Sequence, residues 1–146
     1  MSPLVVDCSV TMAWCFQDES ASYADAALET LAEREAVVPS IWPLEVANVL
    51  LVAERRGRLK RAETTRFLAL LSALPITVDR APPHRSLEGV LALAREQHLS
   101  AYDAAYLELA MRLGGALATL DESLRRAAEK VGLSLFDPRQ RRSKNL

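Results

Sequence analysis

Four carboxylates of this sequence lie in places where carboxylates are not expected. Asp7 and Asp121 each end a short apolar run, whereas Glu45 and Asp103 lie in segments that are otherwise largely apolar. Acidic side chains are almost never fully buried unless a partner compensates their charge. If the fold gathers these four side chains, their mutual repulsion forces some of them to take up protons. A divalent cation that prefers oxygen ligands, such as Mg²⁺ or Mn²⁺, would relieve that repulsion.

An acidic pocket that holds such a cation is suited to one class of chemistry. Mg²⁺ keeps several waters and is commonly held by one or two carboxylates together with a substrate phosphate. The bound ion lowers the pKa of a coordinated water and stabilises the leaving oxygen, whereas the same pocket without a cation would repel a phosphodiester. The four residues therefore favour metal-dependent phosphoryl hydrolysis.

Short apolar runs that alternate with helical patterns predict the elements that position these residues. Apolar runs without alternation are typical of parallel strands that are buried on both faces. Strands that alternate with helices predict an α/β fold, a three-layer α/β/α sandwich with a central, mostly parallel five-stranded sheet. The expected strands are 4–6, 36–38, 76–78, 116–121 and 133–136.

The two strand-end aspartates are expected at one edge of this sheet. Right-handed crossovers bring the carboxyl ends of parallel strands to the same edge, where open α/β sheets bind their ligands. Asp7 and Asp121 both fall there. Pro43 suits the first turn of a helix that follows a strand, which brings Glu45 towards Asp7. Asn48 lies three residues after Glu45 and hence on the same helix face.

Two further helices, 61–74 and 86–97, are amphipathic. Their apolar stripes include Leu68 and Leu70 in the first segment and Leu87 and Leu91 in the second. Such stripes are typical of helices that pack one face against a core. We therefore expect these leucines to point inward.

Each carboxylate also has a purely structural interpretation. Asp7 and Asp121 could cap the helices that follow them. Glu45 and Asp103 could be first-turn acids that the helix dipole favours. Any one of the four could have this role alone, and only the agreement of all four positions favours a shared site.

Four motifs, in order along the chain, resemble those of the PIN-domain nucleases, and in particular the VapC-type toxins of bacterial toxin–antitoxin pairs. D-x-S and T-x-D are weak signals when they occur singly, but the four motifs span about the whole chain with suitable spacing. They are VVDCS at 5–9, PLEVANVL at 43–50, SAYDAAYL at 100–107 and ATLD at 118–121.

The resemblance implies a ribonuclease that needs Mg²⁺ or Mn²⁺. It implies an acidic site made of Asp7, Glu45, Asp103 and Asp121. Ser9 and Thr119 would then lie beside the metal as hydroxyl ligands or as donors that orient the ligands, and Asn48 would be a further candidate for that supporting role. The family also implies a homodimer and a small antitoxin protein that inserts near the site.

Composition and length are compatible with this interpretation. We expect a single PIN-like nuclease domain over 1–137 and a basic, flexible tail over 138–146. The net charge of −1 does not exclude RNA binding, which depends on how the charge is distributed. The basic cluster Arg55, Arg56 and Arg58 could contact RNA phosphates or could simply be a solvated helix end.

The same features predict a cytoplasmic protein without a membrane segment. No apolar run approaches the ~20 residues that span a bilayer, and no basic segment precedes an apolar one as in a signal peptide. Cys8 and Cys15 are seven residues apart, about 10 Å along a helix, which is beyond disulfide reach.

Two other functions compete with the nuclease. One is a metal-dependent phosphatase of another α/β class, with Asp7 as nucleophile. That chemistry usually needs a second acid two residues later, where this chain has Ser9. The other is a non-catalytic module, either receiver-like or an inactive PIN scaffold that binds a partner. An inactive scaffold would be expected to have lost one or more of the four acids.

Overall fold

The chain forms a parallel four-stranded sheet with helices on both faces. The computed structural model describes residues 2–16, 21–81 and 83–139. The strand order across the sheet is β3-β2-β1-β4. The strands are β1 (Leu4–Val6), β2 (Ala36–Val38), β3 (Ile76–Val78) and β4 (Ala116–Ala118).

The central strand β1 is buried because both of its edges are paired. Val5 lies opposite Val37 of β2 and opposite Leu117 of β4 in parallel register. All three residues of β1 are buried, as expected for an apolar run without alternation. The sheet therefore brings the carboxyl end of β1, where Asp7 follows, between the ends of its neighbours.

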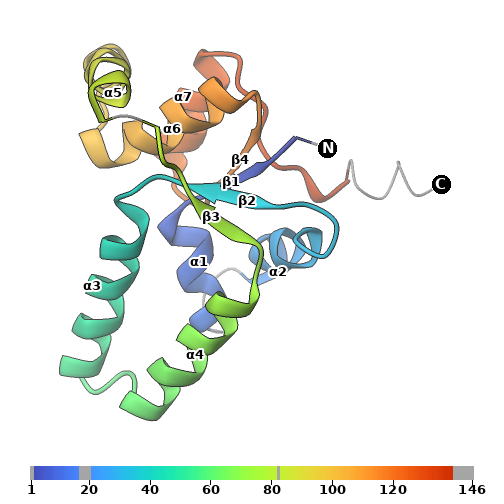
Figure 1. Cartoon of the computed structure of the whole chain (residues 1–146), viewed down its shortest axis with the longest axis vertical. Helices are drawn as coiled ribbons and strands as arrows, with labels where there is room; N and C mark the ends of the chain where they lie inside the picture. Colours follow the sequence, from blue (N-terminus) through green and yellow to red (C-terminus); the bar gives the residue numbers. More distant parts are fainter. Residues whose placement is uncertain (1, 17–20, 82, 140–146) are drawn as a thin grey trace.

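Seven helices surround the sheet within the described part of the chain. In Figure 1, α5, α6 and α7 lie over one face, α1 and α2 lie on the other side, and α3 and α4 extend away from α5–α7. The helices are α1 (Cys8–Cys15), α2 (Ala21–Thr30), α3 (Trp42–Arg55), α4 (Arg61–Ala73), α5 (Pro83–Gln97), α6 (Ala101–Leu113) and α7 (Glu122–Lys130).

Residues that alternate along β1 divide the core into two clusters. Leu4 and Val6 pack with residues of α1 and α2, whereas Val5 packs with residues of α3, α6 and α7. Tyr106 of α6 is among the largest fully buried side chains of the second cluster. The α/β/α sandwich predicted from the sequence is thus confirmed.

The strand count is one lower than expected. Segment 133–136 contributes a single parallel bridge between Leu117 and Leu135. Backbone hydrogen bonds from Leu117 N to Ser134 O (3.0 Å) and from Phe136 N to Leu117 O (2.8 Å) form this bridge. The five-stranded sheet was therefore a wrong prediction, because the last apolar run follows β4 for only one residue pair.

The strand expected over 116–121 ends at Ala118, because Thr119 and Asp121 turn into the cap of α7. The helix expected over 86–97 begins earlier, at Pro83. The tail prediction from residue 140 onward lies outside the described residues. Arg139, just before it, is exposed and pairs with Asp137 at 3.4 Å.

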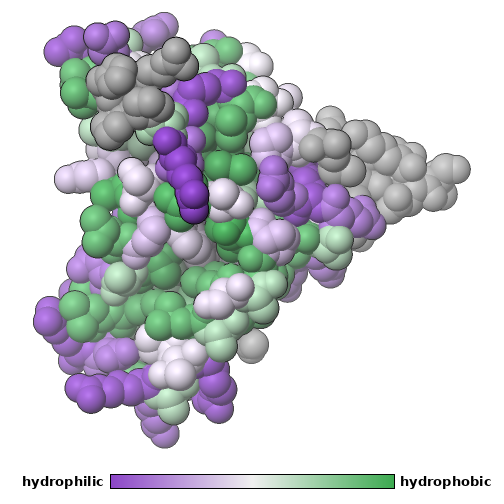
Figure 2. Space-filling view, in the orientation of Figure 1, coloured by the Kyte–Doolittle hydropathy of each residue, from purple (hydrophilic) through white to green (hydrophobic). Residues whose placement is uncertain are grey.

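The amphipathic helices expose leucines that the sequence led us to expect inside. The exposed fractions are 47% for Leu68, 41% for Leu70, 60% for Leu87 and 41% for Leu91. Figure 2 shows apolar side chains gathered over α3 and α4, where Leu68 and Leu70 belong. Prediction of an inward stripe was therefore wrong for these four residues.

None of the helices that the structure describes has both the length and the apolar composition of a bilayer span.

Candidate functional site

Asp7 is a buried carboxylate at the carboxyl end of β1. It is the N-cap of α1, and its Oδ1 accepts hydrogen bonds from Val10 N (3.1 Å) and from the Ser9 hydroxyl (2.6 Å). Its Oδ2 accepts a hydrogen bond of 2.5 Å from the Thr119 hydroxyl. Only 5% of Asp7 is exposed. The capping role and a functional role are therefore compatible, because different lone pairs of one carboxylate can serve each.

The hydroxyls of Ser9 and Thr119 connect two turns at this edge of the sheet. The Ser9 Oγ that donates to Asp7 also accepts from Leu120 N (2.9 Å), and the Thr119 Oγ1 accepts from Asp121 N (3.0 Å). Thr119 is fully buried. The turn after β1 and the turn after β4 are thereby fixed to each other, with Asp7 between them.

Asp121 lies at the beginning of α7 and caps it. One carboxylate oxygen, Oδ1, accepts from Leu124 N at 3.0 Å. The guanidinium of Arg125, one turn further on, donates to the Thr119 carbonyl (3.0 Å) and lies 5.3 Å from the centre of the Tyr23 ring. Asp121 is thus presented from a turn that several hydrogen bonds hold in place.

Glu45 enters the same region from the first turn of α3. Its Oε1 accepts a hydrogen bond of 2.5 Å from the hydroxyl of Tyr106, a residue of α6. Glu45 is half-buried, whereas only 1% of Tyr106 is exposed. The carboxylate of one helix is therefore held by the neighbouring helix.

Asp103 lies in the first turn of α6. Ser100 is the N-cap of this helix, and its hydroxyl accepts from Asp103 N at 3.1 Å. The cap leaves the Asp103 side chain half-buried, among apolar residues that pack the rest of α6 into the core. Position and burial agree with the odd placement seen in the sequence.

Three pairwise charge interactions connect the four carboxylates, from Asp7 to Asp121, from Asp121 to Asp103 and from Asp103 to Glu45. Burial raises the pKa of Asp7 from 3.8 to about 6, against the hydrogen bonds from Ser9, Thr119 and Val10, and the charge of Asp121 adds to the rise. Burial and Asp121 likewise raise the pKa of Asp103. Burial and the charge of Asp103 raise the pKa of Glu45, while the hydrogen bond from Tyr106 lowers it.

The hydroxyls of Ser9 and Thr119 join the turns that carry Asp7 and Asp121. The hydroxyl of Tyr106 joins Glu45 to α6, the helix that carries Asp103. Among residues 2–16, 21–81 and 83–139, no three His, Cys, Asp or Glu side chains converge closely enough in this arrangement to hold a metal ion. The donor set nevertheless fits Mg²⁺ or Mn²⁺ in kind, because it consists of carboxylate and hydroxyl oxygens. The raised pKa values of Asp7, Glu45 and Asp103 mark repulsion and burial that a cation would relieve.

Cys8 lies next to Asp7 but does not offer thiolate chemistry. Burial, Glu45 and Asp7, in that order, raise the pKa of its thiol to about 12. A thiol needs to ionise before it acts as a nucleophile or a metal ligand. Both cysteines are partly buried, and neither forms a disulfide within the described residues.

Other candidate residues lie outside the carboxylate group. Asn48 is exposed on α3 one turn after Glu45, and no hydrogen bond joins the two within the described residues. Arg55 and Arg56 are at the far end of α3, about 15 Å along the axis from Glu45. The Arg58 guanidinium lies 4.0 Å from the centre of the Phe16 ring. An RNA-contacting role for these arginines stays a prediction.

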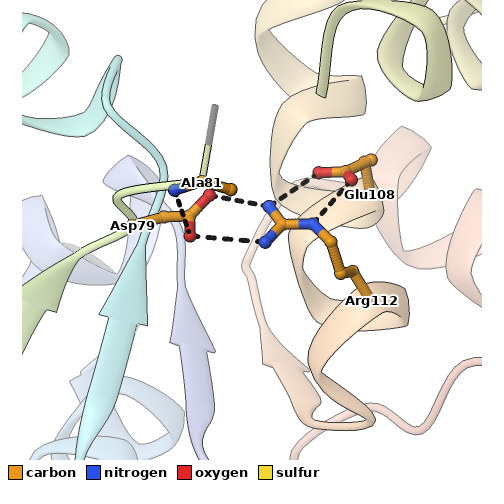
Figure 3. Close-up of polar contacts among 4 residues, drawn as sticks. All are labelled: Asp79, Ala81, Glu108 and Arg112. Carbon is orange, nitrogen blue, oxygen red and sulfur yellow. Dashed lines mark hydrogen bonds and ion pairs between the residues drawn. The ribbon is translucent and has the colours of Figure 1, made fainter. Parts of the chain in front are cut away.

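Sequence reasoning missed a third strand-end aspartate, Asp79 after β3. Figure 3 shows it paired with Arg112 of α6, which also reaches Glu108. The Arg112 Nη2 is 2.6 Å from Asp79 Oδ2, and its Nε is 2.9 Å from Glu108 Oε1. The hydrogen bond from Arg112 lowers the pKa of Asp79. The guanidinium of Arg112 thus compensates the charge of Asp79. The position of Asp79 directly after an apolar strand could have identified it in the sequence.

A second missed contact connects α3 to the turn of Asp7. The indole Nε1 of Trp42 donates to Thr11 Oγ1 (3.0 Å), and the Thr11 hydroxyl donates to the Asp7 carbonyl (2.9 Å). Trp42 begins α3, and Glu45 follows it by three residues. The contact therefore orients the helix that carries Glu45 relative to Asp7.

Comparisons with known proteins agree with this fold. The family model described as PIN domain matches residues 4–130. The chain is 34% identical over 121 residues to Ribonuclease VapC3 from Pyrobaculum aerophilum, covering 83% of this chain and 91% of that protein. This chain belongs to the PIN domain family, and the resemblance seen in its four motifs is confirmed.

Solved structures show the same fold. The crystal structure of PAE2754 from Pyrobaculum aerophilum has a TM-score of 0.70 at 24% identity, covering 95% of this chain and 91% of that one. A toxin–antitoxin complex from Klebsiella pneumoniae has a TM-score of 0.56 at 19% identity, covering 81% of this chain and 86% of that one. At these identities the likeness concerns the fold.

Proposed function

We propose that this protein is a Mg²⁺- or Mn²⁺-dependent endoribonuclease and the toxin of a toxin–antitoxin pair. The observation that carries the proposal is the electrostatically coupled group of Asp7, Glu45, Asp103 and Asp121 at the carboxyl edge of the sheet. The likeness to a ribonuclease over most of both chains supplies the substrate class.

The four carboxylates would hold the cation, and the hydroxyls of Ser9 and Thr119 would keep Asp7 oriented towards it. A cation bound there supplies a water of lowered pKa and neutralises charge on the scissile phosphate. Asp7 and Asp121 are fixed by caps and hydroxyls before any ligand arrives, so their orientation needs little rearrangement on binding. Glu45 and Asp103 would be contributed by the first turns of α3 and α6.

The two competing functions have less support. A phosphatase that uses Asp7 as nucleophile lacks the second acid, and Ser9 at that position donates to Asp7. Membership of the PIN domain family also argues against another α/β class. A non-catalytic scaffold would not need to keep four carboxylates whose repulsion opposes folding.

An exposed apolar groove supports a protein partner. It has a volume of about 420 Å³ and lies between α3, α4 and β3. Its lining includes Trp42, Val46 and Leu68, and Val46 follows Glu45 directly. Large exposed apolar surfaces on a single chain mark interaction sites. We propose that the antitoxin inserts apolar side chains here, close to the acidic site.

The α5 surface supports a homodimer. Leu87 and Leu91 are one turn apart and 60% and 41% exposed. A convex apolar face of this kind suits an isologous contact in which the same helix of a second copy covers it. We place the dimer contact at α5 and the antitoxin at the α3–α4 groove.

We infer a cytoplasmic location because a ribonuclease toxin acts where cellular RNA is found. The spacing of Cys8 and Cys15, which is too long for a disulfide between them, is compatible with a reducing compartment.

Single substitutions test the nuclease directly. Asp103→Asn and Asp7→Asn should each reduce cleavage of an RNA substrate about 100-fold or more and abolish toxicity on expression. Asp25→Asn is the matched control, because Asp25 is an exposed aspartate of α2. If purified Asp103→Asn cleaves RNA at the wild-type rate, Asp103 is not part of the site.

A further inference from the structure

Tyr106 is a buried polar residue that the proposed mechanism does not use. Its ring belongs to the core on the α6 side of the sheet, and only 1% of the residue is exposed. Its hydroxyl donates to Glu45 Oε1 over 2.5 Å. The phenol thus directly contacts one of the four carboxylates.

The contact has a fixed direction. A tyrosine hydroxyl has a reference pKa near 10, so it carries its proton at neutral pH. It can therefore donate that proton in a hydrogen bond, whereas an ionised carboxylate can only accept. Glu45 is consequently held by a donor that does not change its protonation state.

The position of Tyr106 on α6 gives the contact a geometric consequence. Asp103 and Tyr106 are three residues apart and hence on one side of the helix. The same turn of α6 therefore presents Asp103 directly and fixes Glu45 of α3 through the phenol. A glutamate side chain has three rotatable torsions, and its carboxylate needs such a restraint to adopt one orientation.

We propose that Tyr106 is a positioning residue that orients the Glu45 carboxylate for divalent-cation binding. The inference rests on the proposed function, since it concerns the cation of that site. A buried tyrosine hydroxyl often has a partner for structural reasons alone, so the distinction has to come from cation affinity rather than from folding.

The test is a titration of the full chain with Mn²⁺. The electron paramagnetic resonance signal of free Mn²⁺ measures how much of the ion is bound. Tyr106→Phe removes only the hydroxyl and keeps the packed ring. We expect its dissociation constant for Mn²⁺ to rise about tenfold. The Mn²⁺ concentration for half-maximal RNA cleavage should rise by the same factor, with the rate at saturating Mn²⁺ close to that of the wild type.

Thr30→Val is the matched control. The Thr30 hydroxyl donates to the Ala26 carbonyl at 3.0 Å within α2, and only 5% of Thr30 is exposed, so the substitution also removes one hydrogen bond of a buried hydroxyl. Thr30→Val should leave the Mn²⁺ dissociation constant unchanged. An equal rise in both variants would mean that Tyr106 acts on stability alone and would overturn the proposal.

A double substitution shows whether Tyr106 acts through Glu45. Adding Tyr106→Phe to Glu45→Gln should change the Mn²⁺ affinity no further, because the acceptor carboxylate is already lost. The same tenfold effect in both backgrounds would contradict the proposal. If the wild-type protein neither binds Mn²⁺ nor cleaves RNA, the proposed function fails as well. If the wild type does both, and Tyr106→Phe binds Mn²⁺ with the same affinity, only the inference on Tyr106 fails.

Discussion

Asp7 is the residue on which structural and chemical demands conflict most clearly. It caps α1 and accepts hydrogen bonds from two hydroxyls, yet its burial favours the protonated form and raises its pKa to about 6. In the unfolded chain the pKa of the same carboxyl is near 3.8. At neutral pH and without a cation, the ionised Asp7 therefore destabilises the folded state. Such a conflict is common where a side chain is kept for function.

This conflict predicts that Asp7→Asn stabilises the cation-free protein. The raised pKa in the folded state corresponds to a gain of about 1–3 kcal/mol in the free energy of unfolding at pH 7 when the charge is removed. Urea denaturation in EDTA measures it. The folded wild type binds its proton more tightly than the unfolded chain, so the advantage of the variant should be fully present above pH 6 and disappear towards pH 4. A variant that is less stable than the wild type at pH 7 would contradict the burial argument.

The sequence identified these carboxylates because of their surroundings rather than their type. An aspartate after a buried strand and a glutamate in an apolar helix stand out in the sequence, and in the structure the charges of both Asp7 and Glu45 act on Cys8. Tyr106 did not stand out, since a tyrosine among alanine and leucine is typical of a core. Its bond to Glu45 depends on how α3 and α6 pack, which involves residues 61 positions apart.

At the scale of elements, Arg112 connects β3 to α6, the helix that carries Asp103. Its guanidinium reaches the carboxylates of Asp79 and Glu108, and the three side chains are only partly exposed. Such forked, charge-assisted contacts are stronger than single surface pairs. The contact therefore fixes the distal end of α6 to the edge of the sheet.

Arg112→Met should lower the free energy of unfolding by about 1 kcal/mol. Arg126→Met is the matched control, because Arg126 has one ion pair of 3.7 Å to an 86% exposed Glu122. The control should change stability by close to zero. Thermal or urea denaturation of both variants compares them, and equal losses would show that the Arg112 contacts add nothing specific.

Gly115 is required where β4 begins. A Cβ at this position would lie 2.4 Å from the Pro3 carbonyl oxygen, a backbone atom beside β1. Gly115→Ala should therefore destabilise the protein by about 1–3 kcal/mol, through a shift of β4 against β1. Because β4 leads to Thr119 and Asp121, the chemical shifts of both residues should move as well. Wild-type stability in this variant would mean that β4 adapts without strain.

Helices and strands were predicted best where the sequence signal came from neighbouring residues. The four short strands and the helix over 101–113 follow from apolar runs and from the Ser100 cap. The fifth strand failed because whether an apolar run pairs with β4 depends on tertiary packing, which a run of four residues does not encode.

At the scale of the whole molecule, the exposed leucines of α4 and α5 form the surfaces that we propose other chains cover. The amphipathic pattern of α4 and α5 was correct, but an apolar stripe does not tell whether it faces its own core or a partner. Leu68 lines the α3–α4 groove. Leu70 is a further exposed leucine of α4, and Leu87 and Leu91 lie on α5. The apolar pattern of a single sequence could not distinguish a helix face that packs against its own core from one that is exposed.

The two surfaces predict separable defects. The purified chain should have twice its mass of 16.1 kDa by light scattering, and Leu87→Glu with Leu91→Glu should convert it to the monomer. Leu68→Glu, in the groove, should leave the dimer intact and weaken binding of the antitoxin. Loss of the dimer in Leu68→Glu and not in the α5 variant would reverse the assignment of the two surfaces.

The proposed ribonuclease activity depends on a cation held by the four carboxylates. The most direct measurement is RNA cleavage by the purified protein after removal of divalent ions with EDTA, followed by a titration with Mg²⁺ or Mn²⁺. We predict no cleavage in EDTA, recovery on addition of either ion, and no recovery for Asp103→Asn at the same ion concentrations. Cleavage that continues undiminished in EDTA would contradict the proposed dependence on a divalent cation.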